Sequence, residues 1–247
     1  ISLHTFDMEI LRDMLHYSVA LVPNSLLWWI INSSNRLFIA GSLGTAANGI
    51  FAVSNKMPTL LNNITIVFQQ AWQLTAIKSK EERNKDDYSN RVLSVYSAVI
   101  WLCASGMIWL LKPVMKIYVN ASYYDAWRYT PILVLAFAFL AIASYIGTYY
   151  SVAKNNVGML ISAIIGMVVN VVLNTTLIPR IGLQGASISV CFSYFAILLY
   201  RYFDTKAIVR LSLGNPVFIG SVILAVTQTV LSLMEMPYEW AWGMMFV

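Results

Sequence analysis

Charged residues are scarce in this sequence: Asp, Glu, Lys and Arg make up 11% of its 247 residues, against about a quarter in a typical soluble domain. The hydrophobic fraction, by contrast, is 59%. This composition excludes an ordinary soluble domain. It also excludes a disordered chain, which combines low hydrophobicity with a high net charge.

The residues that build catalytic and metal sites are scarce as well. Cys103 and Cys191 each lie within a long uncharged run with no second cysteine nearby, so we expect neither a disulfide nor a metal site. His4 and His16 lack the spacing of a zinc site. The sequence has no glycine-rich phosphate loop and no nucleophile elbow. We therefore expect a protein that is not an enzyme and that uses no cofactor or metal.

Long runs without charge are what the sequence does contain. Eight of them are 19 to 25 residues long, and a helix needs about 20 mostly apolar residues to cross a bilayer. The sequence therefore predicts an all-α protein, a polytopic transmembrane helix bundle. The runs are residues 14–35, 37–55, 57–77, 92–111, 129–153, 155–179, 181–200 and 211–234.

These runs define the expected domain organisation. Residues 1–14 are expected to be a cytoplasmic lead-in, residues 15–201 to hold six spans, and residues 202–247 to hold a cytoplasmic loop, one span and the start of another. A turn is expected within residues 41–49, where three glycines and an asparagine interrupt the first apolar stretch. The expected spans are about 15–40, 47–77, 92–111, 129–152, 156–178, 185–201 and 215–234.

The prolines support this division. Five of the seven, Pro113 among them, fall at expected helix ends or in loops, where proline is tolerated. Pro23 and Pro58 fall inside the first two helices, which we expect to be kinked. In a membrane such kinks persist where a neighbouring helix or a cavity satisfies the freed carbonyl group.

The distribution of Lys and Arg predicts the orientation. The side that holds the N-terminal segment has ten of these residues and the opposite side has four, so the N-terminal end is expected to be cytoplasmic. This asymmetry explains most of the net charge of +5, and no nucleic-acid partner is expected. The ten residues are Arg12, Lys78, Lys80, Arg83, Lys85, Arg91, Lys154, Arg201, Lys206 and Arg210.

Arg36 and Lys56 are ionisable residues inside expected spans. A charge within the membrane is costly, and by default it marks a ligand pathway or a partner. Every Asp and Glu lies in an expected loop, tail or interfacial end, so an anionic ligand would supply the missing counter-charge. The alternative is that both side chains snorkel to the outer interface.

Amide side chains extend this polar region along the first two helices at helical spacing. Lipid would reject such faces, so they either join helices through hydrogen bonds or line an aqueous cavity. The number of long amides favours the cavity. The candidate substrate-binding residues are Arg36, Lys56, Asn32, Asn35, Asn55, Asn62, Gln69 and Gln73.

The expected span 156–178 has a different pattern. Small and amide residues recur there every fourth position, at Gly158, Ser162, Gly166, Asn170 and Asn174. Small residues at this spacing let helix backbones approach closely. We therefore expect this face to pack against other helices, with the two asparagines as interhelical contacts.

Several motifs resemble the C-terminal half of bacterial polysaccharide flippases. They begin with Val22-Pro23-Asn24-Ser25 and residues 28–36, continue through residues 43–44, 49–58 and 68–73, and end with residues 177–186. Together they span nearly the whole chain. Asn35 departs from the pattern, in which an aspartate is expected before the arginine.

The resemblance implies membership of the multidrug, oligosaccharidyl-lipid and polysaccharide exporter superfamily, whose members have two six-helix lobes. This chain would be the second lobe with one or two extra helices, and it begins with Ile1 as a piece of a longer protein would. Its partners would be the N-terminal lobe, membrane lipids and the polysaccharide assembly machinery. We expect the chain alone not to transport, because one wall of the cavity would be missing.

The implied activity is that of a flippase in the bacterial inner membrane. It would move an undecaprenyl-pyrophosphate-linked oligosaccharide, such as a lipopolysaccharide O-antigen, capsule or exopolysaccharide unit, between leaflets by alternating access. Arg36 and Lys56 would then compensate the charge of the pyrophosphate while the amides bind sugar hydroxyls. The coupling ion, a proton or sodium, is left open.

Two other activities compete with this one. A multidrug antiporter of the same superfamily would favour buried acidic residues, which the expected spans lack. A membrane glycosyltransferase or polymerase would place catalytic carboxylates or histidines at a membrane face. The outer loops hold little of that kind beyond Asp125, Glu235 and Glu239.

Overall fold

The computed structural model describes residues 8–78, 85–153, 155–214 and 216–234. These residues form helices and no strand, which confirms the all-α prediction. The α-helices are α1 (Met8–Ser54), α2 (Lys56–Lys78), α3 (Lys85–Tyr118), α4 (Thr130–Ala153), α5 (Asn156–Ile181), α6 (Leu183–Asp204) and α7 (Pro216–Leu233), and the 3₁₀ helices are η3 (Ala121–Arg128) and η4 (Thr205–Ala207). The further span expected near Trp240 lies outside the described residues.

Five helices within the described part of the chain are long and apolar enough to cross a membrane. They are α1, over Leu26–Ser54, together with α3, α4, α5 and α6. The α2 helix, which belongs to the expected span 47–77, is not among them, because amide and hydroxyl side chains interrupt its apolar sequence. A helix of this kind crosses a bilayer only where other parts of the protein shield its polar face from lipid. In α7 the apolar part, Phe218–Leu233, is shorter than a span.

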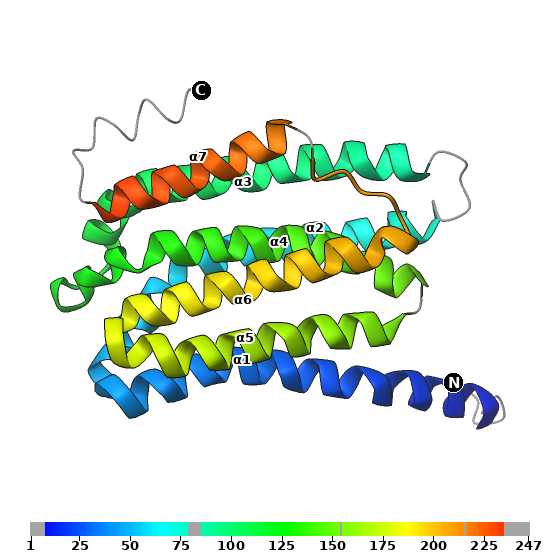
Figure 1. Ribbon diagram of the computed structural model, residues 1–247, viewed down its shortest axis with the longest axis horizontal. Helices are drawn as coiled ribbons and strands as arrows, with labels where there is room; N and C mark the ends of the chain where they lie inside the picture. The colour runs from blue at the N-terminus through cyan, green and yellow to red at the C-terminus, as the bar shows by residue number, and fades with distance from the viewer. Residues whose placement is uncertain (1–7, 79–84, 154, 215, 235–247) are drawn as a thin grey trace, which may run out of the picture.

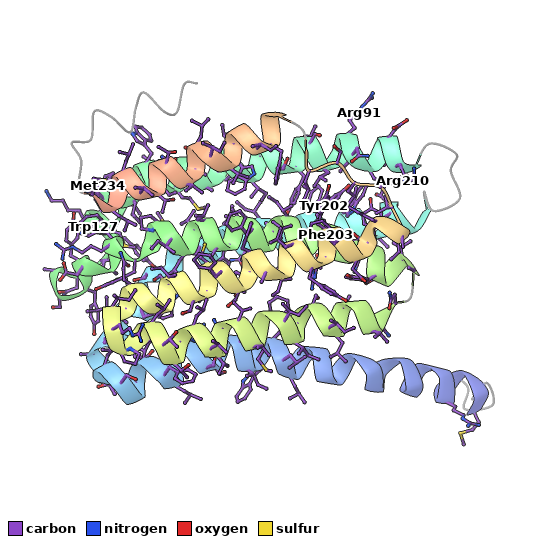
Figure 2. The ribbon with its side chains drawn as sticks, in the orientation of Figure 1. Arg91, Trp127, Tyr202, Phe203, Arg210 and Met234 are labelled. Atoms are coloured by element: carbon purple, nitrogen blue, oxygen red, sulfur yellow. The ribbon has the colours of Figure 1, made fainter. Side chains whose placement is uncertain are left out.

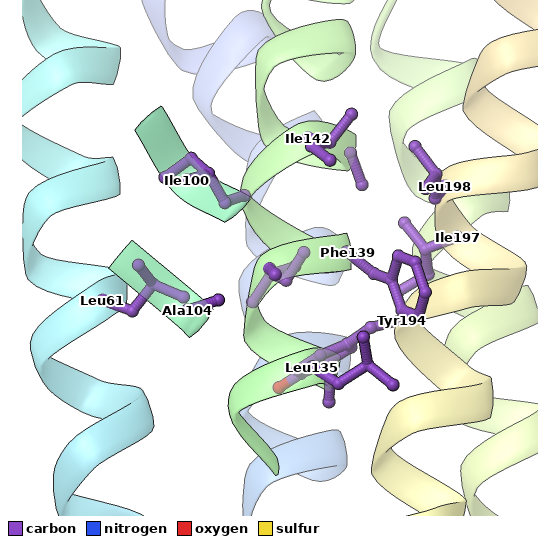
Figure 3. Close-up of a cluster of buried hydrophobic side chains, with 14 of the residues drawn as sticks. Leu61, Ile100, Ala104, Leu135, Phe139, Ile142, Tyr194, Ile197 and Leu198 are labelled. Carbon is purple, nitrogen blue, oxygen red and sulfur yellow. The ribbon is translucent and has the colours of Figure 1, made fainter. Parts of the chain in front are cut away.

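The α4 helix is the centre of the bundle, and 89% of the residues in its most apolar stretch are buried. It packs against α2, α3, α6 and α7 (Figure 1). Figure 3 shows Leu61 of α2 and Ile100 of α3 on one side of α4, and Phe139 of α4 with Tyr194 of α6 on the other. Farther out, α5 covers α6, and α1 covers α5. The central helix therefore positions the inner faces of α2 and α6, which carry polar residues.

The chain changes direction at two breaks, at Gly44 inside α1 and at Asn55 between α1 and α2. Gly44, within the segment where a turn is expected, has a φ of 86°, which glycine adopts without strain. The second break is at Asn55, and Pro58 follows it. Since Pro58 has no N–H, the carbonyl of Ser54 loses its helical donor. The Thr130 hydroxyl of α4 lies 3.2 Å from that carbonyl oxygen and donates to it, as a kink at Pro58 requires.

The prediction that Pro113 lies at a helix end or in a loop is wrong, because α3 runs through it to Tyr118. The last turns of α3 are held by packing: Leu111 and Met115 form a small buried cluster with Trp127 of η3. These tertiary contacts keep α3 helical at Pro113, although a proline next to a charged residue, Lys112, predicts a helix end from the sequence alone. At Pro23, α1 is also continuous, so the kink expected there stays a prediction.

The α5–α6 hairpin is closely packed, as the spacing of small residues predicts. Gly158, Ser162, Gly166, Asn170 and Asn174 are all buried. Past the turn, a Cβ atom built on Gly185 would lie 2.6 Å from the carbonyl carbon of Leu177, closer than side chains approach a backbone. Glycine at this position therefore sets how near the two helices come.

Candidate functional site

The α1 and α2 helices touch only lightly, and two pockets are each lined by residues of α1, α2, α4 and α6. The first, which we call the Arg36 pocket, has a volume of about 300 Å³. The second, the Arg201 pocket, has a volume of about 240 Å³. The Arg36 pocket is lined by Ser33, Asn35, Arg36, Phe51, Asn55, Thr59, Phe137, Val190 and Tyr194, and the Arg201 pocket by Trp28, Gln69, Gln73, Ser144, Gly147, Thr148, Ser151, Met159 and Arg201.

The Arg36 pocket brings together three of the candidate residues, Asn35, Arg36 and Asn55. Arg36 has an exposed side chain, whereas Asn35 is 5% exposed. The Asn55 amide nitrogen donates to the Phe51 carbonyl at 2.8 Å, which leaves its amide oxygen available to the pocket. The described lining thus offers one cation, amides and hydroxyls, and it holds no acidic side chain.

Asn35 also belongs to a hydrogen-bonded network that joins α1 to α5. The Asn174 amide nitrogen donates to Asn35 Oδ1 at 2.7 Å and to Asn170 Oδ1 at 2.9 Å. The Ser34 hydroxyl donates to Asn170 Oδ1 at 2.9 Å. The two asparagines of α5 are therefore interhelical contacts, as their spacing predicts. Asn35 has a structural role beside its place in the pocket wall.

The Arg201 pocket contains two more candidates, Gln69 and Gln73 of α2. The Thr148 hydroxyl of α4 donates to Gln69 Oε1 at 2.9 Å, which holds the amide against the bundle. The Gln69 amide nitrogen is buried and has no hydrogen-bond partner among the described residues. Gln73 has an exposed side chain, so it stands at the rim of the pocket.

Arg201 is the functional candidate that sequence reasoning missed. We counted it with the loop after the sixth span, but α6 continues to Asp204 and Arg201 is 5% exposed. The adjacent Gly147 of α4 makes room for its side chain, because a Cβ atom there would overlap the guanidinium group. No local signal separates Arg201 from a cation at a helix end. The glycine becomes informative only once the pairing of α4 with α6 is known.

The remaining candidates lie apart from both pockets. Lys56, the first residue of α2, is exposed, and Asn62 is half-buried one turn and a half farther along, yet neither lines these pockets. Asn32 belongs to α1, and its side chain lies outside the described residues. Substrate contact by any of the eight candidates stays a prediction.

An aromatic contact joins the walls of the two pockets. The Trp28 ring, in the Arg201 pocket, lies 6.2 Å between centroids from the Tyr194 ring, in the Arg36 pocket. Tyr194 in turn packs edge-on against Phe137, at 5.6 Å. The polar surface between α1 and α2 is thus divided into two parts, each with one arginine.

The chemistry of the described linings is that of binding. They contain guanidinium, amide and hydroxyl groups, and among them are no His, Cys, Asp or Glu side chains. Guanidinium groups pair with phosphates, and amides exchange hydrogen bonds with sugar hydroxyls. Cys103 and Cys191 are free thiols, and no cluster of metal ligands occurs within the described residues.

Comparison with known proteins gives one finding. Residues 2–129, just over half of the chain, match the family described as polysaccharide biosynthesis protein. Neither the curated proteins nor the solved structures gave a match. The matched segment contains α1, α2, α3 and η3, and with them the Arg36 side of the site. The chain therefore belongs to the polysaccharide biosynthesis protein family, and it is a helical membrane protein with a role in the synthesis or export of polysaccharide.

Proposed function

We propose that this protein flips an undecaprenyl-pyrophosphate-linked oligosaccharide across the bacterial inner membrane by alternating access, with the N-terminal end of the chain in the cytoplasm. The observation that carries the proposal is the polar surface between α1 and α2, where Arg36 lines a pocket without an acidic residue in its described wall. Membership of a polysaccharide family supports the same substrate class.

Electrostatics favours an anionic substrate. A pyrophosphate cannot cross hydrocarbon with its charge exposed, because transfer of an unpaired ion to a medium of low polarity is prohibitively costly. An arginine in the wall of a water-accessible cavity offers a bidentate, charge-assisted contact that reduces this cost. An organic cation, the cargo of a multidrug exporter, would meet repulsion from the same guanidinium.

Pocket size favours a cavity shared with a second lobe. Sites for drug-sized ligands have volumes of about 300–1,000 Å³, and the two pockets have about 300 and about 240 Å³. Neither pocket would enclose an oligosaccharide of several sugars. We therefore propose that each holds one group of the substrate, while a facing lobe completes the cavity and the lipid tail stays in the bilayer.

The test is the leaflet distribution of the lipid-linked oligosaccharide in cells that lack the full-length protein. Deletion should trap the glycan lipid in the cytoplasmic leaflet, and the wild-type protein should clear it. Arg36→Ala, at matched protein levels, should clear it at least about tenfold more slowly, the loss expected for one charge-assisted contact. Lys116→Ala, which removes an exposed cation outside both pockets, is the control.

The outcomes separate the competing activities. Normal exposure of the glycan lipid after deletion, together with sensitivity to organic cations, would replace the flippase with a drug exporter. Trapped glycan lipid that Arg36→Ala still clears at the wild-type rate would keep the flippase and remove Arg36 from its binding site. In that case the side chain only extends to the interface.

A further inference from the structure

Arg201 brings into the bundle a positive charge that the proposed function assigns to no particular group of the substrate. Its Nε donates to Ser162 Oγ at 3.0 Å, and its Nη1 donates to the Ala143 carbonyl at 2.9 Å. A guanidinium has five N–H donors, and the described residues supply no partner for the Nη2 group. A cation that is 5% exposed and has unused donors is stabilised by a complementary group that reaches it.

The pocket beside Arg201 has the composition of an anion site. Its other polar lining groups are the amides of Gln69 and Gln73 and the hydroxyls of Ser144, Thr148 and Ser151. The buried Gln69 Nε2 is a second donor for which the described part of the chain supplies no partner. No acidic side chain is among the described residues that line the pocket. Two unpaired donors, one of them charged, thus share a cavity of about 240 Å³.

The fold holds the guanidinium in place from three helices. Ser162 comes from α5, Ala143 from α4, and Arg201 itself from α6. Gly147 of α4 lies so close that any side chain there would displace Nη1. An arginine fixed in this way loses little conformational freedom when it binds a ligand, and its planar fork matches the geometry of a phosphate.

We propose that the Arg201 pocket binds a phosphate-bearing anion as a site separate from the Arg36 pocket. The identity of that anion as the pyrophosphate of the transported lipid rests on the proposed function. The two sites lie between the same helices, with the contact between Trp28 and Tyr194 joining their walls. A pyrophosphate that passes along α1 and α2 would then have two successive resting positions.

The test measures binding of inorganic pyrophosphate to the purified full-length protein in nanodiscs of phosphatidylcholine, a neutral lipid. Pyrophosphate should raise the temperature of unfolding of the wild type in a saturable way. Arg201→Gln should weaken this binding about ten- to hundredfold, the effect of losing one charged hydrogen-bond donor set. Arg201→Lys should fall between the two, because it keeps the charge and loses the fork.

Two further variants control for folding and for net charge. Ser151→Phe fills the pocket but leaves Arg201 and both of its hydrogen bonds intact, so it should weaken the binding that depends on Arg201 as Arg201→Gln does. Arg210→Gln removes an exposed cation from the same end of the bundle and should bind as the wild type does. Figure 2 shows Arg210 at the end where Tyr202 and Phe203, the residues after Arg201, lie.

The proposal is overturned if pyrophosphate does not stabilise the wild type, or if Ser151→Phe binds it with wild-type affinity. Nanodiscs with phosphatidylglycerol distinguish the source of the anion. Competition by this lipid through Arg201 would assign the site to an anionic headgroup, whereas competition by undecaprenyl pyrophosphate alone would assign it to the substrate. Binding is measured without transport, so a protein that binds pyrophosphate through Arg201 and fails the leaflet assay would lose the proposed function and keep this site.

Discussion

The break before α2 gives a quantitative prediction about how the membrane fold compensates for a proline. The carbonyl of Ser54 has lost its helical donor to Pro58, and the Thr130 hydroxyl replaces it at 3.2 Å. Ser54 and Thr130 are both 0% exposed, so water offers no substitute. In Thr130→Val the shape is kept and the carbonyl is left unpaired. The Thr130 hydroxyl also donates to the Ala126 carbonyl, at 2.9 Å, and that carbonyl keeps donors from Ser54 Oγ and Tyr129 N when the hydroxyl is removed.

We expect Thr130→Val to lower the free energy of unfolding by about 1 kcal/mol, between the average for hydrogen bonds in membranes and the cost of an unpaired buried carbonyl. In a Pro58→Ala background the restored N–H should pair with Ser54, because neighbouring helical bonds from Asn55 to Phe51 and from Thr59 to Asn55 already exist. The same substitution should then cost less than about 0.5 kcal/mol.

The assay is equilibrium unfolding in mixed micelles, followed by tryptophan fluorescence, for the wild type, both single variants and the double variant. Thr227→Val, which alters an exposed hydroxyl on α7, should change stability by less than about 0.5 kcal/mol. If the two substitutions at Thr130 and Pro58 are additive, the hydroxyl does not replace the lost donor and the account of the kink is refuted.

Three other predictions follow from the packing. Gly185→Ala should destabilise the protein by about 1–3 kcal/mol in thermal unfolding, because its Cβ would meet backbone, whereas Gly220→Ala, with open space around it, should not; equal stabilities would contradict this. Gln228→Leu removes the two hydrogen bonds that Gln228 of α7 makes with Ser105 of α3, so limited proteolysis should cleave α7 faster than in the wild type, and an unchanged rate would show that these bonds do not hold α7 in place. In a cysteine-free background, an impermeant maleimide should label Tyr118→Cys, on the expected outer side, in intact cells, and Tyr88→Cys, on the expected cytoplasmic side, only after permeabilisation. The reverse pattern of labelling would invert the proposed orientation.

The helices can be predicted from the sequence because one physical constraint, the exclusion of charge from hydrocarbon, decides where charged residues fall. Charge is excluded from hydrocarbon, so uncharged runs mark the helices whatever their partners are. The break at Pro58 was also predictable, since proline removes a donor in any environment. The continuation of α3 through Pro113 was not, because it depends on Trp127, a residue of a different element, covering Leu111 and Met115.

The site was predictable only in part for a related reason. Helical spacing identifies the polar face of α2 and the asparagines of α5, because both lie on one helix. It does not reveal that Asn35 and Asn174 meet across two helices, or that Gln69 and Arg201 line one pocket. Counting the cations of each loop assigns Arg201 to a loop outside the bundle, because nothing in the sequence shows whether a residue at the end of an uncharged run is buried. Sites made by several helices need the packing to be known first.

The burial of α4 has a consequence for how the sequence can vary. Lipid-facing positions accept almost any apolar side chain, so a helix with one lipid face tolerates substitution with a period of about 3.6 residues. In α5 only 28% of the residues in the most apolar stretch are buried, whereas in α4 the buried share is 89%. A systematic substitution scan should therefore show a periodic tolerance along α5 and almost none along α4. Although α4 is among the most hydrophobic helices of the protein, it should be the one least free to change.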